Sequence, residues 1–187
     1  MLSLASERPE RMFLSMQVSP TKKHAVFLDG PIGVGKTTYG RHLATEFAGH
    51  FLDGDDFSDH ELPWFASSLS TNRGILKAIW AALDEDAVVF VAYPIRCINW
   101  IFFNRHLRSR QVETVFVGLQ ASLASIASEE RTRQLSEAEL TRSREMISQG
   151  YGSRTFYDLL IQTDIASESE VTKMTKLALE KWLGGAV

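Results

Sequence analysis

Short apolar runs alternate along the chain with longer stretches in which apolar residues recur every three or four positions. The short runs predict buried strands, and the longer stretches predict amphipathic helices. The expected strands are 24–29, 50–53, 88–92, 113–118 and 159–161. The expected helices are 36–48, 72–84, 96–109, a polar helical region over 120–150, and a last helix that begins after Ser167. Strands that alternate with helices in this way predict an α/β fold with a parallel sheet.

Two serines mark the expected starts of helices in the second half of the chain. Ser136 is followed by Glu139, and Ser167 by Glu170, which is the spacing of a capping box. Four apolar residues of the last helix are expected to share its inward face: Val171, Met174, Ala178 and Trp182.

The segment 24–38 joins the first expected strand to a helix through a glycine-rich loop. Gly30, Gly35, Lys36 and Thr37 satisfy the Walker A pattern G-x-x-x-x-G-K-[ST]. Glycines allow the backbone to wrap around phosphate oxygens, and the helix N-terminus attracts the anion. The residues expected to contact the nucleotide are Gly30, Pro31, Ile32, Gly33, Val34, Gly35, Lys36, Thr37 and Thr38. The loop predicts an ATP site in which Lys36 neutralises the β- and γ-phosphates and Thr37 is a ligand of Mg²⁺.

Carboxylates follow the second expected strand, at the edge of the sheet where ligands bind in α/β proteins. We expect Asp53 to position Mg²⁺ or its water, and Asp55 to receive the proton of an attacking hydroxyl. Asp56 is expected to cap a turn or to face solvent, and all three could instead be turn residues. No acid follows strand 88–92, where Tyr93 and Pro94 stand, so more of the metal-binding role is expected of Asp53.

The order strand, Gly-x-x-Gly-x-Gly-Lys-Thr-Thr, helix and Phe51-Leu52-Asp53-Gly54-Asp55 resembles the shikimate kinase and gluconate kinase group of small phosphate-loop kinases. The resemblance extends over about 24–183. It implies the P-loop NTPase fold, a three-layer α/β/α sandwich on a mainly parallel five-stranded sheet. The implied strand order is 2-3-1-4-5, with a helical lid over about 120–150.

The same resemblance implies roles for four arginines. Arg73 would bind the carboxylate of the acceptor, Arg131 and Arg133 of the lid would contact the phosphates, and Arg154 would reach the acceptor site. Asp53 and Asp55 would serve the metal and the acceptor. Tyr93-Pro94 stands where shikimate kinases have a glycine cluster, and Phe57-Ser58-Asp59-His60 differs from gluconate kinases. The resemblance therefore leaves the acceptor open.

Length and composition fit one domain. The chain of 187 residues is expected to comprise a loose tail, 1–22, and a single kinase domain, 23–187. A net charge of −3 argues against a broad surface that binds nucleic acid. Cys97, the one cysteine, excludes an intramolecular disulfide, fits a cytoplasmic protein, and is expected to be buried. No apolar run spans a membrane, and no histidine spacing predicts a zinc site. A monomer or a homodimer is expected.

These patterns favour a kinase that uses ATP and Mg²⁺ to phosphorylate a hydroxyl of a small metabolite. Two other classes stay open. A nucleotide or polynucleotide kinase would use the aromatic and basic segment 99–110, in which Trp100, Phe102 and Phe103 stand near Arg105, Arg108 and Arg110, to bind bases and phosphates. A non-catalytic ATP-binding regulatory module would explain the missing acid after strand 88–92.

Overall fold

Five parallel strands form the centre of the protein in its computed structural model, which describes residues 22–58, 64–129 and 133–184. The strands are β1 (Lys23–Asp29), β2 (His50–Asp53), β3 (Val88–Ala92), β4 (Val112–Gln120) and β5 (Leu159–Gln162). They lie side by side in the order β2-β3-β1-β4-β5, and every neighbouring pair is parallel. The predicted strand order is confirmed. All five strands therefore end at one edge of the sheet, with β1 in the middle.

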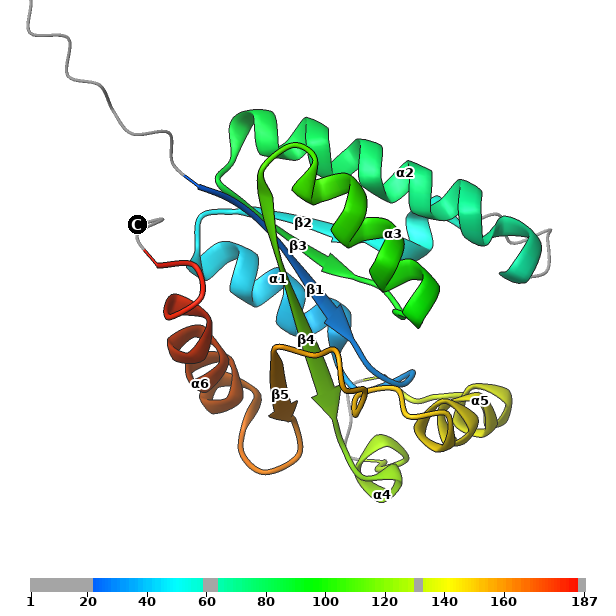
Figure 1. Ribbon diagram of the computed structural model, residues 1–187. Helices are drawn as coiled ribbons and strands as arrows, with labels where there is room; N and C mark the ends of the chain where they lie inside the picture. Colours follow the sequence, from blue (N-terminus) through cyan, green and yellow to red (C-terminus); the bar gives the residue numbers. More distant parts are fainter. Residues whose placement is uncertain (1–21, 59–63, 130–132, 185–187) are drawn as a thin grey trace, which may run out of the picture.

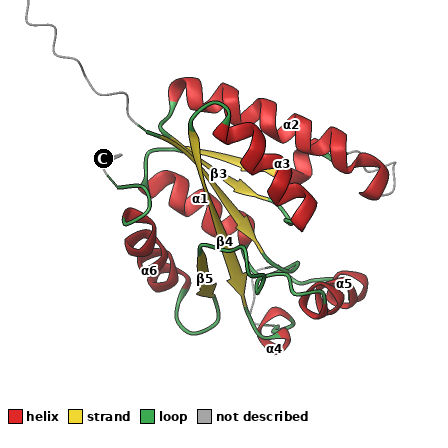
Figure 2. Cartoon of the chain, in the orientation of Figure 1, coloured by secondary structure: helices red, strands yellow, loops and turns green. Residues whose placement is uncertain are grey.

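Helices cover both faces of this sheet (Figure 1). The helices are α1 (Lys36–Glu46), a short 3-10 helix η1 (Gly54–Phe57), α2 (Trp64–Glu85), α3 (Cys97–Arg108), α4 (Leu123–Ile126), α5 (Glu137–Ser148) and α6 (Glu168–Glu180). Helices α1 and α6 pack on one face and α2 and α3 on the other, which confirms the three-layer sandwich. Helices α4 and α5 lie beyond the carboxyl ends of the strands (Figure 2).

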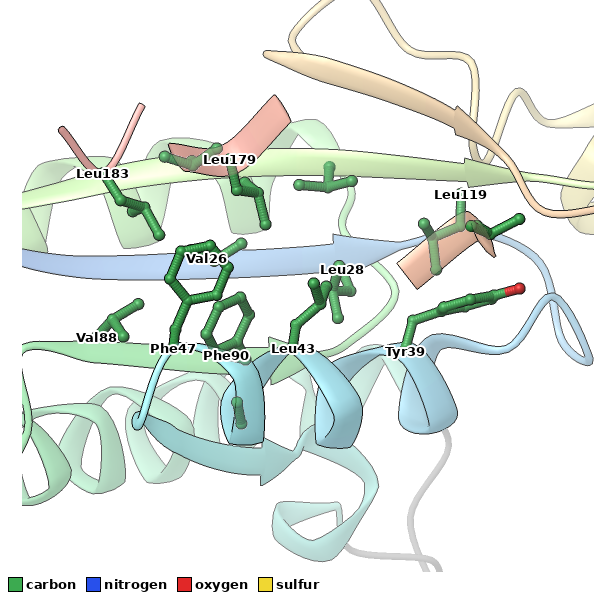
Figure 3. Close-up of a cluster of buried hydrophobic side chains, with 14 of the residues drawn as sticks. Val26, Leu28, Tyr39, Leu43, Phe47, Val88, Phe90, Leu119, Leu179 and Leu183 are labelled. Carbon is green, nitrogen blue, oxygen red and sulfur yellow. The ribbon is translucent and has the colours of Figure 1, made fainter. Parts of the chain in front are cut away.

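The side chains of β1 and β3 alternate between the two faces. Val26 and Leu28 pack with α1 and α6, as Figure 3 shows, whereas Ala25 and Phe27 pack with α2 and α3. Phe27 is fully buried and stacks on Phe116 of β4, with ring centroids 4.9 Å apart. Because both faces of each central strand are covered, these strands read in the sequence as unbroken apolar runs.

The predicted inward face of the last helix is correct at Val171, which is buried, and wrong at Met174 and Trp182, which are 53% and 45% exposed. From Val171 the buried stripe of α6 continues through Thr175 and Leu179. The Thr175 hydroxyl donates to the Val171 carbonyl at 2.7 Å, so its polar atom is satisfied within the helix while the residue faces the core. Because threonine is not counted as apolar, the pattern of apolar residues alone does not reveal this buried face.

The structure also tests three local predictions: the two capping boxes, the burial of Cys97 and the helices of the region 120–150. The capping boxes at Ser136 and Ser167 are confirmed, because each serine accepts a backbone N–H and is met by the glutamate three residues later. Cys97 is exposed rather than buried, because it is the first residue of α3 and the core-facing side of that helix begins at Asn99. Among the described residues of the region 120–150, α4 comes first and α5 begins directly after Ser136, where the sequence predicts that a helix restarts.

The expected N-terminal tail lies, apart from residue 22, outside the described residues. In the described part of the chain, no helix combines the length and apolar character needed to cross a membrane.

Phe27→Ala is expected to lower the free energy of unfolding by about 3–5 kcal/mol, because it removes a fully buried ring from the centre of the sheet. Urea-induced unfolding measures the change. Phe102→Ala is the matched control, since Phe102 is only partly buried, and it should cost clearly less. A loss below about 1 kcal/mol for Phe27→Ala would contradict the packing described here.

Candidate active site

The phosphate loop connects the end of β1 to the start of α1. Gly33 and Gly35 have φ angles of 80° and 101°, in the left-handed region that favours glycine. A Cβ at Gly33 would lie 2.6 Å from the end of the Leu135 side chain, so this leucine packs closely over the loop. A cavity of about 260 Å³ adjoins this loop, and Lys36, Thr37, Arg133 and Glu139 are among the residues that line it.

Lys36 lies along the inside of the loop. Its ammonium donates to the backbone carbonyls of Gly30 and Pro31, at 2.9 Å each. Burial lowers the pKa of Lys36, and the nearby carboxylates of Asp29, Asp55 and Asp53 act in the opposite direction. The charge of Lys36 is thus held in a poorly solvated position where it can act strongly on a bound phosphate.

Thr37 and Asp53 stand together at the edge of the loop, as the sequence predicts. The Thr37 hydroxyl donates to Asp53 Oδ2 at 2.9 Å, and Asp53 Oδ1 accepts the backbone N–H of Asp55 at 3.2 Å. A hydroxyl and a carboxylate oxygen so close together fit Mg²⁺, which binds through one or two protein oxygens with phosphates and water. In the described ranges no group of three or more His, Cys, Asp or Glu side chains could hold a metal ion.

A second cavity, of about 320 Å³, lies beside the first. Residues of the phosphate loop, the Asp53–Asp55 loop, α2, the connection from β3 to α3, and α5 line it. Tyr93, which follows β3, packs on Gly54, where a Cβ would lie 2.4 Å from the tyrosine ring. Burial and the charge of Asp55 raise the pKa of Tyr93 to about 12, so its hydroxyl remains protonated at neutral pH. Tyr93 thus offers this cavity a neutral polar wall.

Two arginines that the resemblance did not assign to the acceptor line this second cavity. Arg96 precedes α3 and donates from Nε to the Tyr151 hydroxyl at 2.7 Å, and Arg142 projects from α5 beside Glu145. Behind Arg96, the buried amides of Asn99 and Asn72 bond to each other at 3.0 Å. The position of Arg96 just past the carboxyl end of β3 was a usable signal, because β3 is the neighbour of β1.

The structure does not bring the two expected acceptor arginines to this cavity. Arg73 is exposed on α2, because the adjacent Thr71 and Asn72 take the inward-facing positions. The Arg154 guanidinium lies over the Tyr151 ring, 4.4 Å from its centroid, so Tyr151 separates it from the cavity. Of the two expected lid arginines, Arg133 lines the phosphate cavity and pairs with Glu139, whereas Arg131 lies outside the described residues.

Asp29 is a buried carboxylate at the site that the sequence reading missed. It is fully buried at the end of β1, where its Oδ1 accepts the Gly30 N–H at 2.6 Å and its Oδ2 accepts the Tyr157 hydroxyl. Burial raises the pKa of Asp29 to about 6, although hydrogen bonds and the charge of Lys36 act to lower it. The predicted strand 24–29 includes Asp29, but nothing in the neighbouring sequence indicates that its carboxylate is buried and hydrogen-bonded to Tyr157.

The aromatic segment of α3 is used in packing. Phe103 is buried against Phe27, and Trp100 and Phe102 are partly buried against the same core. These rings therefore do not form an exposed platform for stacking bases.

Comparisons with known proteins give short sequence matches to shikimate kinases. No family model matches the chain. The shikimate kinases of Buchnera aphidicola and Aeromonas salmonicida are 51% and 49% identical to it over 35 and 41 residues, which is 19% and 22% of this chain. These matches span only about a fifth of the length of the curated relatives, 20% and 22%.

Solved structures match a much larger share of the chain. A gluconokinase from Sinorhizobium meliloti has a TM-score of 0.65 at 14% identity and covers 87% of this chain and 94% of its own. An APS kinase from Mycobacterium tuberculosis, in complex with AMPPNP and APS, has a TM-score of 0.61 at 13% identity, with coverage of 85% and 99%. A shikimate kinase from Acinetobacter baumannii, in complex with shikimate, has a TM-score of 0.54 at 20% identity, with coverage of 86% and 95%. The comparisons confirm the predicted resemblance to phosphate-loop small-molecule kinases and the fold that goes with it.

Proposed function

We propose that the protein is an ATP-dependent kinase that transfers the γ-phosphate to a hydroxyl group of a small molecule. One observation carries this proposal: the two cavities share Ile32, Lys36, Thr37 and Asp55 in their linings. A phosphate held in the first cavity would therefore lie next to a molecule held in the second. Transfer between two substrates depends on this kind of juxtaposition.

The residues around the shared boundary divide the work of the reaction. The backbone of the phosphate loop and Lys36 would bind the phosphates, and Thr37 and Asp53 would hold Mg²⁺. The metal ion would neutralise charge on the transferred group. Asp55, on the acceptor side, would orient the attacking hydroxyl and receive its proton.

Among the described residues of the predicted lid, Arg133 best fits contact with the phosphates. It lines the phosphate cavity, where its guanidinium is paired with Glu139 of α5. An arginine in this place can bind two phosphate oxygens at once and remains charged at any physiological pH. If a phosphate replaced the Glu139 carboxylate as the partner of Arg133, the guanidinium would lie on the group that is transferred.

The acceptor cavity favours a molecule that carries an anionic group as well as a hydroxyl. Arg96 and Arg142 line the cavity together with Asp55. A carboxylate or phosphate near the arginines would leave the hydroxyl near Asp55. The cavity, at about 320 Å³, has the size of a small-metabolite site.

Lys36→Ala is expected to reduce phosphate transfer by about 10³-fold or more, because no other side chain of the loop carries a positive charge to the phosphates. Transfer from labelled ATP measures this, and circular dichroism checks that the fold is kept. Lys77→Ala, on the exposed side of α2, is the matched control and should retain full activity. Normal turnover by Lys36→Ala would rule out the mechanism.

Asp55→Asn is expected to lower kcat by about 10²-fold or more while changing ATP affinity by less than about threefold, because the carboxylate serves the acceptor rather than the nucleotide. Steady-state kinetics and calorimetric ATP binding separate the two effects. Asp56→Asn, on the adjacent exposed position, is the control. Equal losses in turnover and in ATP binding would show that Asp55 does not act on the acceptor.

A further inference from the structure

One buried carboxylate joins three separate parts of the site. Asp29 accepts the Gly30 N–H of the phosphate loop at 2.6 Å and the hydroxyl of Tyr157, which lies in the segment before β5. The backbone N–H of Ile95, in the connection from β3 to α3, acts on the same carboxylate. Because Asp29 is fully buried, these donors replace water as its hydrogen-bond partners.

The contacts continue from Tyr157 to the wall of the acceptor cavity. The Tyr157 hydroxyl accepts the backbone N–H of Gly152 at 3.2 Å. The adjacent Tyr151 accepts from Arg96 Nε at 2.7 Å, and both Tyr151 and Arg96 line the acceptor cavity. Hydrogen bonds, together with the peptide link between Tyr151 and Gly152, thus connect the phosphate loop to Arg96 of the acceptor cavity.

The backbone is shaped to let Tyr157 cross the end of β4. A Cβ at Gly118 would lie 2.6 Å from the Tyr157 ring, so glycine is needed where the ring passes. Gly152 has a φ of +85°, and a Cβ there would lie 2.5 Å from the Leu119 carbonyl oxygen. The first approach gives the Tyr157 ring room over β4, and the second holds the segment that contains Gly152 close to the end of the same strand.

We propose that Asp29 is a positioning residue of the phosphotransfer site, which fixes the first peptide of the phosphate loop relative to the Tyr151–Arg96 wall of the acceptor cavity. This inference rests on the proposed function. An ionised carboxylate has enough lone pairs to accept from Gly30, Ile95 and Tyr157 together. A protonated Asp29 would have to donate one hydrogen itself, and the Tyr157 hydroxyl would then lose its acceptor.

We call the hydrogen bonds of Asp29 to Gly30, Ile95 and Tyr157 the Asp29 tie. The charge state of Asp29 sets the pH range in which this tie is complete. Burial raises the pKa of Asp29 to about 6, against the opposing effect of Tyr157 and Lys36. The titratable groups that face it are Lys36, from α1, and Tyr157, from the segment before β5, while the connection after β3 contributes the Ile95 N–H. The tie is therefore complete at neutral pH, and it is lost as the pH falls through the pKa and the carboxylate takes up a proton.

The test compares Asp29→Asn with a matched control, Asp158→Asn. The Asp158 carboxylate also accepts a backbone N–H, that of Phe116 at 2.8 Å, but does so in the middle of β4 rather than at the phosphate loop. Hydrogen exchange of the full-length protein is followed in the loop 29–35 and in the segment 150–157. Asp29→Asn should speed exchange in both regions by about tenfold or more, whereas Asp158→Asn should leave the loop unchanged.

Kinetics provide a readout that a purely structural role would not move. The ratio of wild-type to Asp29→Asn kcat/KM for the acceptor should be about tenfold or more at pH 7.5 and should shrink below about threefold at pH 5. Tyr157→Phe, a milder change, should raise the acceptor KM while leaving the KM for ATP within about twofold. It also serves as the test if Asp29→Asn does not fold.

Exchange rates for Asp29→Asn that match the wild type in both regions would overturn the proposal, as would a kcat/KM ratio that does not change with pH. For Tyr157→Phe, equal increases in the two KM values would do the same. If the wild-type protein transfers phosphate to no acceptor, the proposed function fails on its own, and the exchange measurement still decides whether Asp29 ties the loop to the acceptor wall.

Discussion

The parallel sheet imposes the constraint on which the rest of the structure depends. Because all five strands run in the same direction, the phosphate loop after β1, the Asp53–Asp55 loop after β2 and the Tyr93–Arg96 connection after β3 meet at one edge. Residues from separate parts of the sequence thereby surround a single pair of adjoining cavities. Helices α4 and α5 lie at the same edge. The chemistry we propose depends on this convergence and on the side chains that α1, α5 and the loops after the strands bring to it.

Helices α4 and α5 also pack directly against the phosphate loop. Ser143 of α5 is buried and donates to the Ile32 carbonyl at 2.8 Å, and Leu135 and Ile126 pack around Gly33. The same helix carries Arg142 to the acceptor cavity and Glu139 to the Arg133 guanidinium. In the kinase that we propose, a movement of α5 would therefore act on both cavities at once, as a closing element of such an enzyme would.

The sequence was sufficient to predict the parts of the fold that rest on local patterns. The strands and the Walker A loop follow from apolar periodicity and from a motif whose residues are close in the chain, whereas the strand order follows from the resemblance to small phosphate-loop kinases. The proximity of Thr37 to Asp53 follows from the position of both at the carboxyl edge of the sheet. The phase of α6 could not be read in this way, because Thr175 occupies a buried position with its hydroxyl bonded inside the helix. Asp29 was equally hidden, since its partner Tyr157 lies 128 residues away. The sequence could not show that Arg96 rather than Arg73 lines the second cavity, because only the packing of α2 turns Thr71 and Asn72 inward and leaves Arg73 exposed.

The central claim is that a phosphate bound at the loop is passed to a hydroxyl held beside Asp55. The most direct measurement is phosphorus NMR of the protein mixed with ATP, Mg²⁺ and a panel of hydroxylated anions, which includes shikimate, gluconate, other hydroxy acids and nucleoside monophosphates. Our account predicts that one of these acceptors yields a new phosphorylated product in step with the formation of ADP. ADP that forms with no phosphorylated acceptor, or a panel in which no ADP forms above the rate without acceptor, would contradict it.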